Sequence, residues 1–252
     1  MIVAKQKPIS EIKEFIEAHS KVLIVGCGGC VTVCLSGGEL ETQRLASALR
    51  IAYLQDGIEK ELIAPTITRQ CDPEFVEDLV EKYIEGQGID AVVTLACGIG
   101  ANYLADRLEG IAVYPGQNTL FMGGVDEPGK WKELCAACGE CIVYKTGGIC
   151  PVARCAKTIM NGPCGGTNDG KCELGEDTDC VWYLIVNRMK ELDSLDTLTT
   201  LEPPRDWSTS RDGGPRTYEV EDREALVSES EGEEDGCRDL NQRAFGERQK
   251  HP

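Results

Sequence analysis

The cysteine-rich stretch from residue 135 to residue 180 constrains the fold of this chain more than any other feature. It holds eight of the 14 cysteines of the chain and little of the apolar alternation that marks a strand or an amphipathic helix. A segment with so few large apolar side chains cannot bury enough surface to hold one conformation, so it needs crosslinks or bound metal. The sequence therefore predicts a lobe that is stabilised by its cysteines.

The beginning of the chain favours metal over disulfides as the role of these cysteines. The first 20 residues lack the apolar stretch of a secretion signal, and no run reaches the roughly 18 apolar residues of a membrane span. We therefore expect a cytoplasmic protein, and the cytosol keeps thiols reduced. The net charge of −17 argues against nucleic acid or an anionic membrane as a partner.

Histidine is almost absent, which narrows the chemistry further. The chain has only two, His19 and His251. This scarcity argues against Cys2His2 zinc sites, histidine acid–base catalysis and cysteine–histidine nucleophile pairs. Any metal site must be built mostly from thiolates, and we expect no catalytic residue in this chain.

The spacing in CAACGECIVYKTGGICPVARC favours an iron–sulfur centre over zinc. Cys135, Cys138 and Cys141 match the start of the bacterial ferredoxin pattern, whereas a zinc ribbon would show two separate C-x2-C pairs. Cys150 precedes a proline as in ferredoxins, but the gap before it is eight residues rather than three. The eight thiols suffice for two four-thiolate centres. The sequence does not partition the remaining ligands, and one zinc site stays open: Cys150, Cys155, Cys164, Cys172 and Cys180.

The first half of the chain has a different pattern, in which apolar strand-like runs alternate with helical ones. Such alternation predicts a parallel sheet with right-handed crossovers. We expect an α/β fold in which a small Rossmann-like parallel-sheet domain, residues 1–125, is followed by a cysteine-rich metal-cluster domain, residues 126–200, with a C-terminal helix. Residues 201–252 read as an extended acidic tail without fixed structure, since nine acidic residues fall between 219 and 235.

Three strands of the predicted sheet end in cysteine. The first leads to Cys27 and Cys30, the second to Cys71 and the third to Cys97. The carboxyl ends of parallel strands meet at one edge, where such folds gather ligands, so these four thiols are predicted to form a metal site. Cys34 is a fifth candidate. The alternative is that these are buried apolar cysteines, which are common.

Several segments together resemble one known family. They are GCGGCVTVCLSGGELET, TRQCDPEF, LACGIG, CGECIVYKTGGICPVARCAKTIMNGPCGGTNDGKCE and DCVW. These segments are similar to the MetV-like small subunits of two-subunit methylenetetrahydrofolate reductases, which form the methylenetetrahydrofolate reductase C-terminal domain family. The resemblance covers roughly residues 10–220.

The resemblance implies a function. MetV-like subunits pair with a MetF-type (β/α)8-barrel subunit that carries flavin and reduces methylene- to methyl-tetrahydrofolate in one-carbon (Wood–Ljungdahl) metabolism. It implies two or three iron–sulfur clusters of the 4Fe-4S kind, from which electrons pass to that flavin, and a further electron-donor protein. Some members are described as zinc-containing. The cysteines implied are Cys27, Cys30, Cys34, Cys71, Cys97, Cys135, Cys138, Cys141, Cys150, Cys155, Cys164, Cys172 and Cys180.

Two other functions stay open. The chain could be a zinc-stabilised structural subunit of the same complex, or an iron–sulfur adaptor for another flavoprotein, such as a heterodisulfide reductase or hydrogenase system. The sequence has no complete flavin, nicotinamide or P-loop motif. We therefore expect an oxidoreductase subunit that is not catalytic alone.

Overall fold

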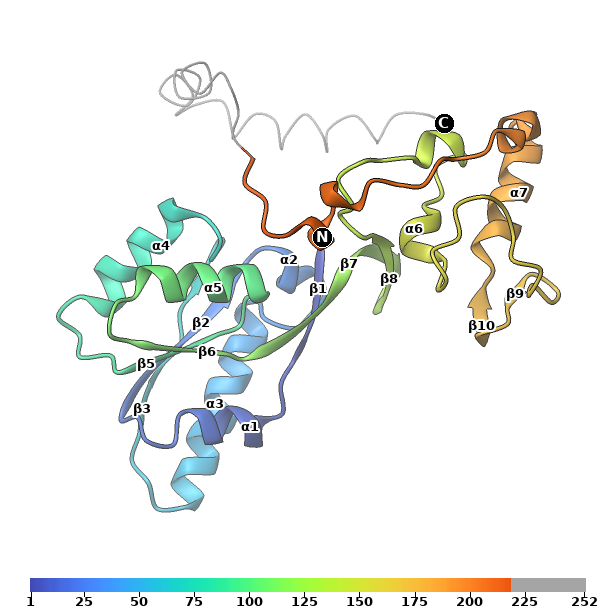
Figure 1. Ribbon diagram of the computed structural model, residues 1–252. Coiled ribbons are helices and arrows are strands. Elements are labelled where there is room, and N and C mark those ends of the chain that lie inside the picture. The colour runs from blue at the N-terminus through green and yellow to red at the C-terminus, as the bar shows by residue number, and fades with distance from the viewer. Residues whose placement is uncertain (219–252) are drawn as a thin grey trace, which may run out of the picture.

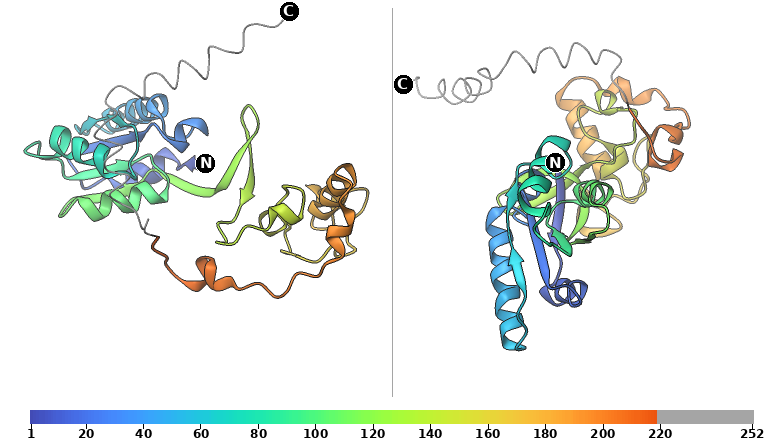
Figure 2. Two further views of the ribbon diagram at one scale, coloured as in Figure 1. Left: turned by 90° about the horizontal axis from the view of Figure 1, so that it is seen from above. Right: turned by 90° about the vertical axis from the view of Figure 1, so that its left-hand side faces the viewer.

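The computed structural model describes residues 1–218 (Figure 1). An α/β lobe holds the N-terminal half, and a cysteine-rich lobe holds the segment after residue 135. A long β-hairpin reaches from the first lobe toward the second, and the chain after residue 200, dark orange in Figure 2, runs back toward the first lobe. The acidic stretch 219–235 lies outside the described residues.

The parallel sheet predicted for the first half is confirmed. Its strands run side by side in the order β3-β2-β5-β6, and β4 pairs with β2 beyond the end of β3. All pairings in this five-stranded sheet are parallel. The strands are β2 (Lys21–Cys27), β3 (Glu61–Ile63), β4 (Thr66–Ile67), β5 (Ala91–Thr94) and β6 (Ala112–Pro115).

Strand β2 is apolar on both faces because helices cover both sides of the sheet. Val22 and Ile24 pack into a core with the helices before and after β2, and Leu23 and Val25 pack into a second core on the opposite face. Continuous apolar strands of this kind are typical of buried parallel sheets. The helices are α1 (Ile9–Phe15) and α3 (Glu39–Gln55) on the first face, and α4 (Pro73–Leu79), extended by a π-helical turn (Val80–Ile84), and α5 (Gly98–Arg107) on the second.

The strand order creates a topological switch point between β2 and β5. From β2 the chain crosses to β3 and β4 on one side, and it then returns to add β5 and β6 on the other. The connections after β2 and β5 therefore leave the sheet in opposite directions and open a crevice at the carboxyl ends of the strands, where α/β folds bind ligands. Cys27 ends β2, and Cys97 follows β5.

A three-stranded antiparallel sheet joins the two lobes, and the sequence reading did not anticipate it. Strand β7 (Gln117–Glu127) pairs with β1 (Ile2–Gln6) on one side and with β8 (Lys130–Cys135) on the other. The predicted boundary between residues 125 and 126 lies inside β7. The division into domains stays a prediction.

The cysteine-rich lobe contains little regular structure apart from its C-terminal helix α7 (Val181–Glu191), which the amphipathic pattern predicted. Trp182, Ile185 and Met189 from α7 form most of its small core. The other elements are short: a 3-10 turn (Val143–Lys145), α6 (Pro151–Arg154), β9 (Lys171–Cys172), β10 (Gly175–Asp179) and a second 3-10 turn (Leu195–Thr199).

Residues 201–218 contain two short 3-10 turns, Trp207–Thr209 and Arg211–Gly213, and are otherwise without regular structure. This part of the predicted tail is hydrogen-bonded to the cysteine-rich lobe. Glu202 forms an ion pair of 2.7 Å with Lys145 and exchanges two hydrogen bonds with Asn161. Within residues 1–218 there is no helix with the length and apolar character needed to cross a bilayer.

Candidate metal centres

All thirteen cysteines between residues 1 and 218 are free thiols. As the side chains stand in this part of the chain, no three histidine, cysteine, aspartate or glutamate groups form a cluster ready to hold a metal ion. Eleven of the thirteen nevertheless fall into three groups, three at the edge of the parallel sheet and four around each of two separate pockets of the cysteine-rich lobe.

The first group lies at the carboxyl edge of the sheet, as the strand ends predict. Cys27 and Cys97 pack in one small cluster with Ala96. Burial raises the pKa of the Cys71 thiol, and the charges of Cys27 and Cys97 raise that pKa further. Because such charge effects act only between neighbouring groups, these three thiols converge on one region.

A fully buried glutamine aligns the three strand ends. The amide of Gln70 donates hydrogen bonds to the carbonyl oxygens of Val25 (2.9 Å) and Gly26 (3.0 Å) at the end of β2. Its amide oxygen accepts a hydrogen bond of 2.5 Å from the hydroxyl of Thr94 at the end of β5. Cys71 directly follows this glutamine, so the polar network fixes where the third thiol enters the group.

The two remaining cysteines of this region have different surroundings. Cys30 begins the short helix α2 (Cys30–Val33), three residues after Cys27, and is partly exposed. Cys34 is buried, and its sulfur lies 3.1 Å from the hydroxyl of Ser36 and 3.5 Å from the backbone N–H of Ala4 in β1. The thiol of Cys34 therefore ties α2 to β1, which is the role of a structural cysteine.

The second group of thiols lines one pocket of the cysteine-rich lobe. It consists of Cys135 at the end of β8, Cys138 and Cys141 in the following loop, and Cys150 at the N-terminus of α6. The loop turns tightly because Ala137 (φ +48°) and Gly139 (φ +85°) both adopt left-handed backbone angles. Backbone N–H groups already point at two of the sulfurs: Ala137 at Cys135 and Ala153 at Cys150, each at 3.4 Å.

The segment after residue 201 lies against this loop. Arg205 donates a hydrogen bond to the sulfur of Cys138 at 3.1 Å, and the hydroxyl of Thr209 donates to the carbonyl oxygen of Cys138 at 2.9 Å. Arg216 donates to the carbonyl oxygen of Ala137 at 3.2 Å. We call residues 202–216 the strap.

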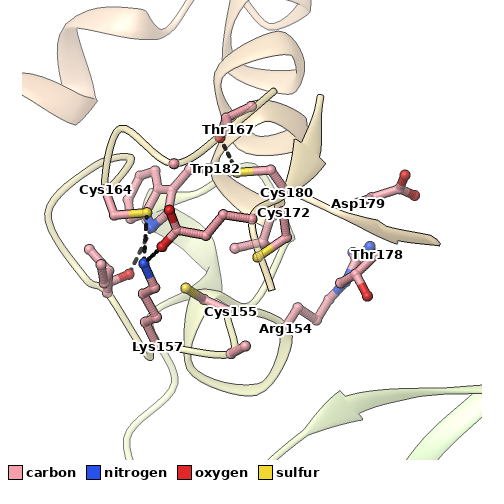
Figure 3. A pocket seen from close by; sticks show the side chains of 15 residues that line it. Arg154, Cys155, Lys157, Cys164, Thr167, Cys172, Thr178, Asp179, Cys180 and Trp182 are labelled. Carbon is pink, nitrogen blue, oxygen red and sulfur yellow. Dashed lines mark hydrogen bonds and ion pairs between the residues drawn. The ribbon is translucent and has the colours of Figure 1, made fainter. Parts of the chain in front are cut away.

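The third group lines a separate pocket between α6, β9 and α7. Figure 3 shows the sulfur atoms of four cysteines directed into this pocket from four different segments. They are Cys155, Cys164, Cys172 and Cys180. The pocket is closed on one side by Trp182, whose indole N–H donates to the carbonyl oxygen of Ile159 at 2.8 Å.

In this pocket, the surroundings of Cys164 favour its thiolate form. A hydrogen bond from the backbone N–H of Gly166 lowers the pKa of the Cys164 thiol, and the nearby ammonium of Lys157, 3.7 Å from its sulfur, lowers it further. Lys157 also forms an ion pair with Glu173. The hydroxyl of Thr167 lies 2.8 Å from the sulfur of Cys180.

The spacing left open whether Cys150 and Cys155 belong to the same group of thiols, and the structure separates them. Cys150 and Cys155 lie on either side of the four-residue helix α6, and they face different pockets. Each pocket is lined by four cysteines. The donor set fits an iron–sulfur cluster or zinc, because soft thiolate ligands in fours suit both.

A family model matches the part of the chain that holds these pockets. Residues 114–208 match the family model described as methylene-tetrahydrofolate reductase C terminal. The match spans both four-cysteine pockets and Arg205, and it leaves out the sheet-edge thiols. It supports the relation to methylene-tetrahydrofolate reductase that the sequence motifs suggested. No curated protein and no solved structure matches the chain.

Sequence reasoning missed two residues that shape the groups. Gln70 stands next to a cysteine in TRQC, but a single glutamine gives no local sign that it is buried. Arg205 follows two prolines in a stretch that reads as tail, 67 residues away from Cys138. No periodic pattern connects these two positions, so only the path of the folded chain reveals the contact.

Proposed function

We propose that this chain is the iron–sulfur electron-transfer subunit of a methylenetetrahydrofolate reductase complex, a MetV-like partner of a flavin-containing MetF-type subunit. The observation that carries the proposal is the division of eight cysteines into two sets of four around two pockets, within the region that matches the reductase family. Four thiolates are the usual ligand set of a 4Fe-4S cluster.

The proposal assigns ligands by pocket. The first centre would be held by Cys135, Cys138, Cys141 and Cys150, and the second by Cys155, Cys164, Cys172 and Cys180. A third centre at the sheet edge would use Cys27, Cys30, Cys71 and Cys97, without Cys34. Bound clusters would supply reversible one-electron chemistry.

The residues of this chain would hold, orient and shield those centres. Backbone N–H groups of Ala137 and Ala153 and the hydroxyl of Thr167 donate to ligand sulfurs. Trp182 and the core of the cysteine-rich lobe limit the access of water to the pocket lined by Cys155, Cys164, Cys172 and Cys180. Hydrogen bonds to sulfur and exclusion of water both set the potential at which a cluster accepts an electron.

Catalysis on the folate would belong to the partner. The sequence offers thiolate sites and no complete flavin or nicotinamide motif, and an electron-transfer subunit needs neither. The donor that reduces this chain would be a further protein of the cytoplasm.

A zinc-stabilised structural role is the second candidate, and one observation favours it for the second pocket. Cys155 and Cys180 pack against the small core of the cysteine-rich lobe, so a metal there would supply folding free energy, as structural zinc does.

The experiment that tests the proposal is electron transfer to a purified MetF-type subunit. The chain is reduced under anaerobic conditions and mixed with the oxidised flavoprotein in a stopped-flow instrument, and flavin absorbance is followed. We expect reduction of the flavin that slows strongly with the Cys138→Ser variant. Equal rates with wild type and Cys138→Ser would contradict the proposal.

A further inference from the structure

We call the pocket lined by Cys135, Cys138, Cys141 and Cys150 the first pocket, and the pocket lined by Cys155, Cys164, Cys172 and Cys180 the second. Among the described residues, Arg205 is the one cationic side chain that donates a hydrogen bond to a sulfur of the first pocket. Its terminal nitrogen Nη2 donates to Cys138 Sγ at 3.1 Å and also to the carbonyl oxygen of Glu140. The guanidinium lies over the ring of Trp207, 5.4 Å from the ring centre. One arginine thus bridges the strap and the C-x2-C-x2-C loop.

The other two nitrogens of the Arg205 guanidinium carry N–H groups that no described residue accepts. Nε and Nη1 of Arg205 are buried and have no hydrogen-bond partner among residues 1–218. None of the ion pairs in this part of the chain includes Arg205. Arg205 is half-buried, and N–H groups of a cation that are buried without partners destabilise the fold unless a neighbouring group carries negative charge.

The thiolates supply that charge. Four cysteinates around one metal centre carry net negative charge, which a guanidinium at hydrogen-bond distance from one sulfur offsets. We propose that Arg205 is a positioning residue that compensates the charge of the centre at Cys135, Cys138, Cys141 and Cys150 and raises its reduction potential. The redox part of this inference rests on the proposed function, while the charge compensation applies to any metal held by these thiols.

Three other contacts fix the position of the strap that carries Arg205. Thr209 and Arg216 hold the strap on the loop through the carbonyl oxygens of Cys138 and Ala137, and Glu202 anchors its start through Lys145. The guanidinium is therefore held at a fixed place beside Cys138. The second pocket has a lysine instead, and Lys157 is already paired with Glu173.

The physical basis is electrostatic. Reduction adds an electron to a centre that is already negative, so a nearby positive charge and an N–H bond to sulfur both favour the reduced form. Removing the charge should shift the reduction equilibrium of this centre toward the oxidised form by about tenfold. A tenfold change in a one-electron couple corresponds to about 59 mV.

The test is an EPR-monitored redox titration of the full chain, purified without oxygen. The signal of the first pocket is identified as the one that Cys138→Ser removes. In Arg205→Gln this signal should titrate at a potential about 59 mV lower, while the other signals keep theirs. Arg205→Lys should recover most of the shift because it restores the charge. Arg211→Gln is the matched control, since Arg211 belongs to the same strap, is exposed and should leave every potential unchanged.

An unchanged potential in Arg205→Gln, or an equal shift in Arg211→Gln, would overturn the inference. Should Arg205→Gln fail to retain this cluster, the comparison passes to Arg205→Lys, which must keep both the cluster and its potential. Should the wild-type protein contain zinc and no iron, the electron-transfer proposal fails, and Arg205 is tested by chelator competition. Arg205→Gln should then release one zinc at least ten times faster than Arg211→Gln, and equal rates would overturn the charge compensation.

Discussion

The hydroxyl of Thr94 donates a 2.5 Å hydrogen bond to the amide oxygen of Gln70, and both side chains are fully buried. This contact joins the end of β5 to the residue before Cys71, and the same amide binds two carbonyl oxygens at the end of β2. The network holds the three strand ends that carry the sheet-edge thiols. It predicts that the geometry of this group depends on a residue that cannot itself bind metal.

Gln70→Leu should destabilise the α/β lobe by about 3 kcal/mol, because it removes three buried hydrogen bonds, two to the carbonyl oxygens of Val25 and Gly26 and one from the hydroxyl of Thr94. Any metal bound at the sheet edge should be lost with it, while metal in the cysteine-rich lobe is retained. Denaturant unfolding and metal analysis measure the two effects. Gln55→Leu, on the exposed end of α3, is the control and should change neither. Equal stability of the two variants would contradict this role of Gln70.

Two glycines with the same backbone angle allow backbone strain to be separated from packing against the strap. Gly129 and Gly139 both have φ +85°, but only at Gly139 would a Cβ overlap with a neighbour, the carbonyl oxygen of Thr209. Gly129→Ala should cost about 1 kcal/mol of strain. Gly139→Ala should cost a further ~1–3 kcal/mol and detach the strap. Denaturant unfolding followed by tryptophan fluorescence measures the stability of each variant and reports on the strap, because Trp207 lies in it. A Gly139→Ala variant as stable as Gly129→Ala would mean that the strap does not rest on this loop.

The two pockets predict how metal is lost from cysteine variants. Cys150→Ser and Cys155→Ser should each remove the metal of one centre, about four iron atoms for a 4Fe-4S cluster, and the double variant should lose both sets. Cys34→Ser should keep its full metal content, because its thiol binds Ala4 and Ser36. If the double variant lost no more metal than either single variant, the two cysteines would serve one centre and the partition would be wrong.

The pKa shifts predict different thiol reactivities in the reduced, metal-free protein. The pKa of Cys164 is lowered, so its thiolate persists to lower pH, whereas the pKa of Cys71 is raised and its thiol stays protonated to higher pH. Both side chains are exposed. Since alkylation requires the thiolate, iodoacetamide should modify Cys164 faster than Cys71 at neutral pH, and the gap should narrow as the pH rises.

Lys157→Gln should slow the modification of Cys164 without abolishing its advantage, because the N–H of Gly166 makes the larger contribution. Lys190→Gln, at the exposed end of α7, is the matched control and should leave the rate unchanged. Peptide mass spectrometry after timed alkylation gives both rates. Faster modification of Cys71 at neutral pH would contradict the electrostatics described for the two groups.

The parallel sheet could be predicted because each of its strands and helices is a local pattern of apolar residues. The meeting of Cys27, Cys71 and Cys97 followed, since parallel strands end at the same edge. The partition of the other cysteines could not be predicted. It depends on tight loops in which non-glycine residues such as Ala137 and Thr158 adopt positive φ, and on contacts between distant segments. The β1-β7-β8 sheet could not be predicted for the same reason, since β1 and β7 are more than 100 residues apart in the sequence.

These thiols are proposed to hold iron–sulfur centres. Iron, acid-labile sulfide and zinc measured together in the anaerobically isolated protein decide whether they do. We expect iron and sulfide in equal amounts, about eight of each from the two four-cysteine pockets and more if the sheet-edge thiols are also filled. Stoichiometric zinc without iron or sulfide would contradict this proposal.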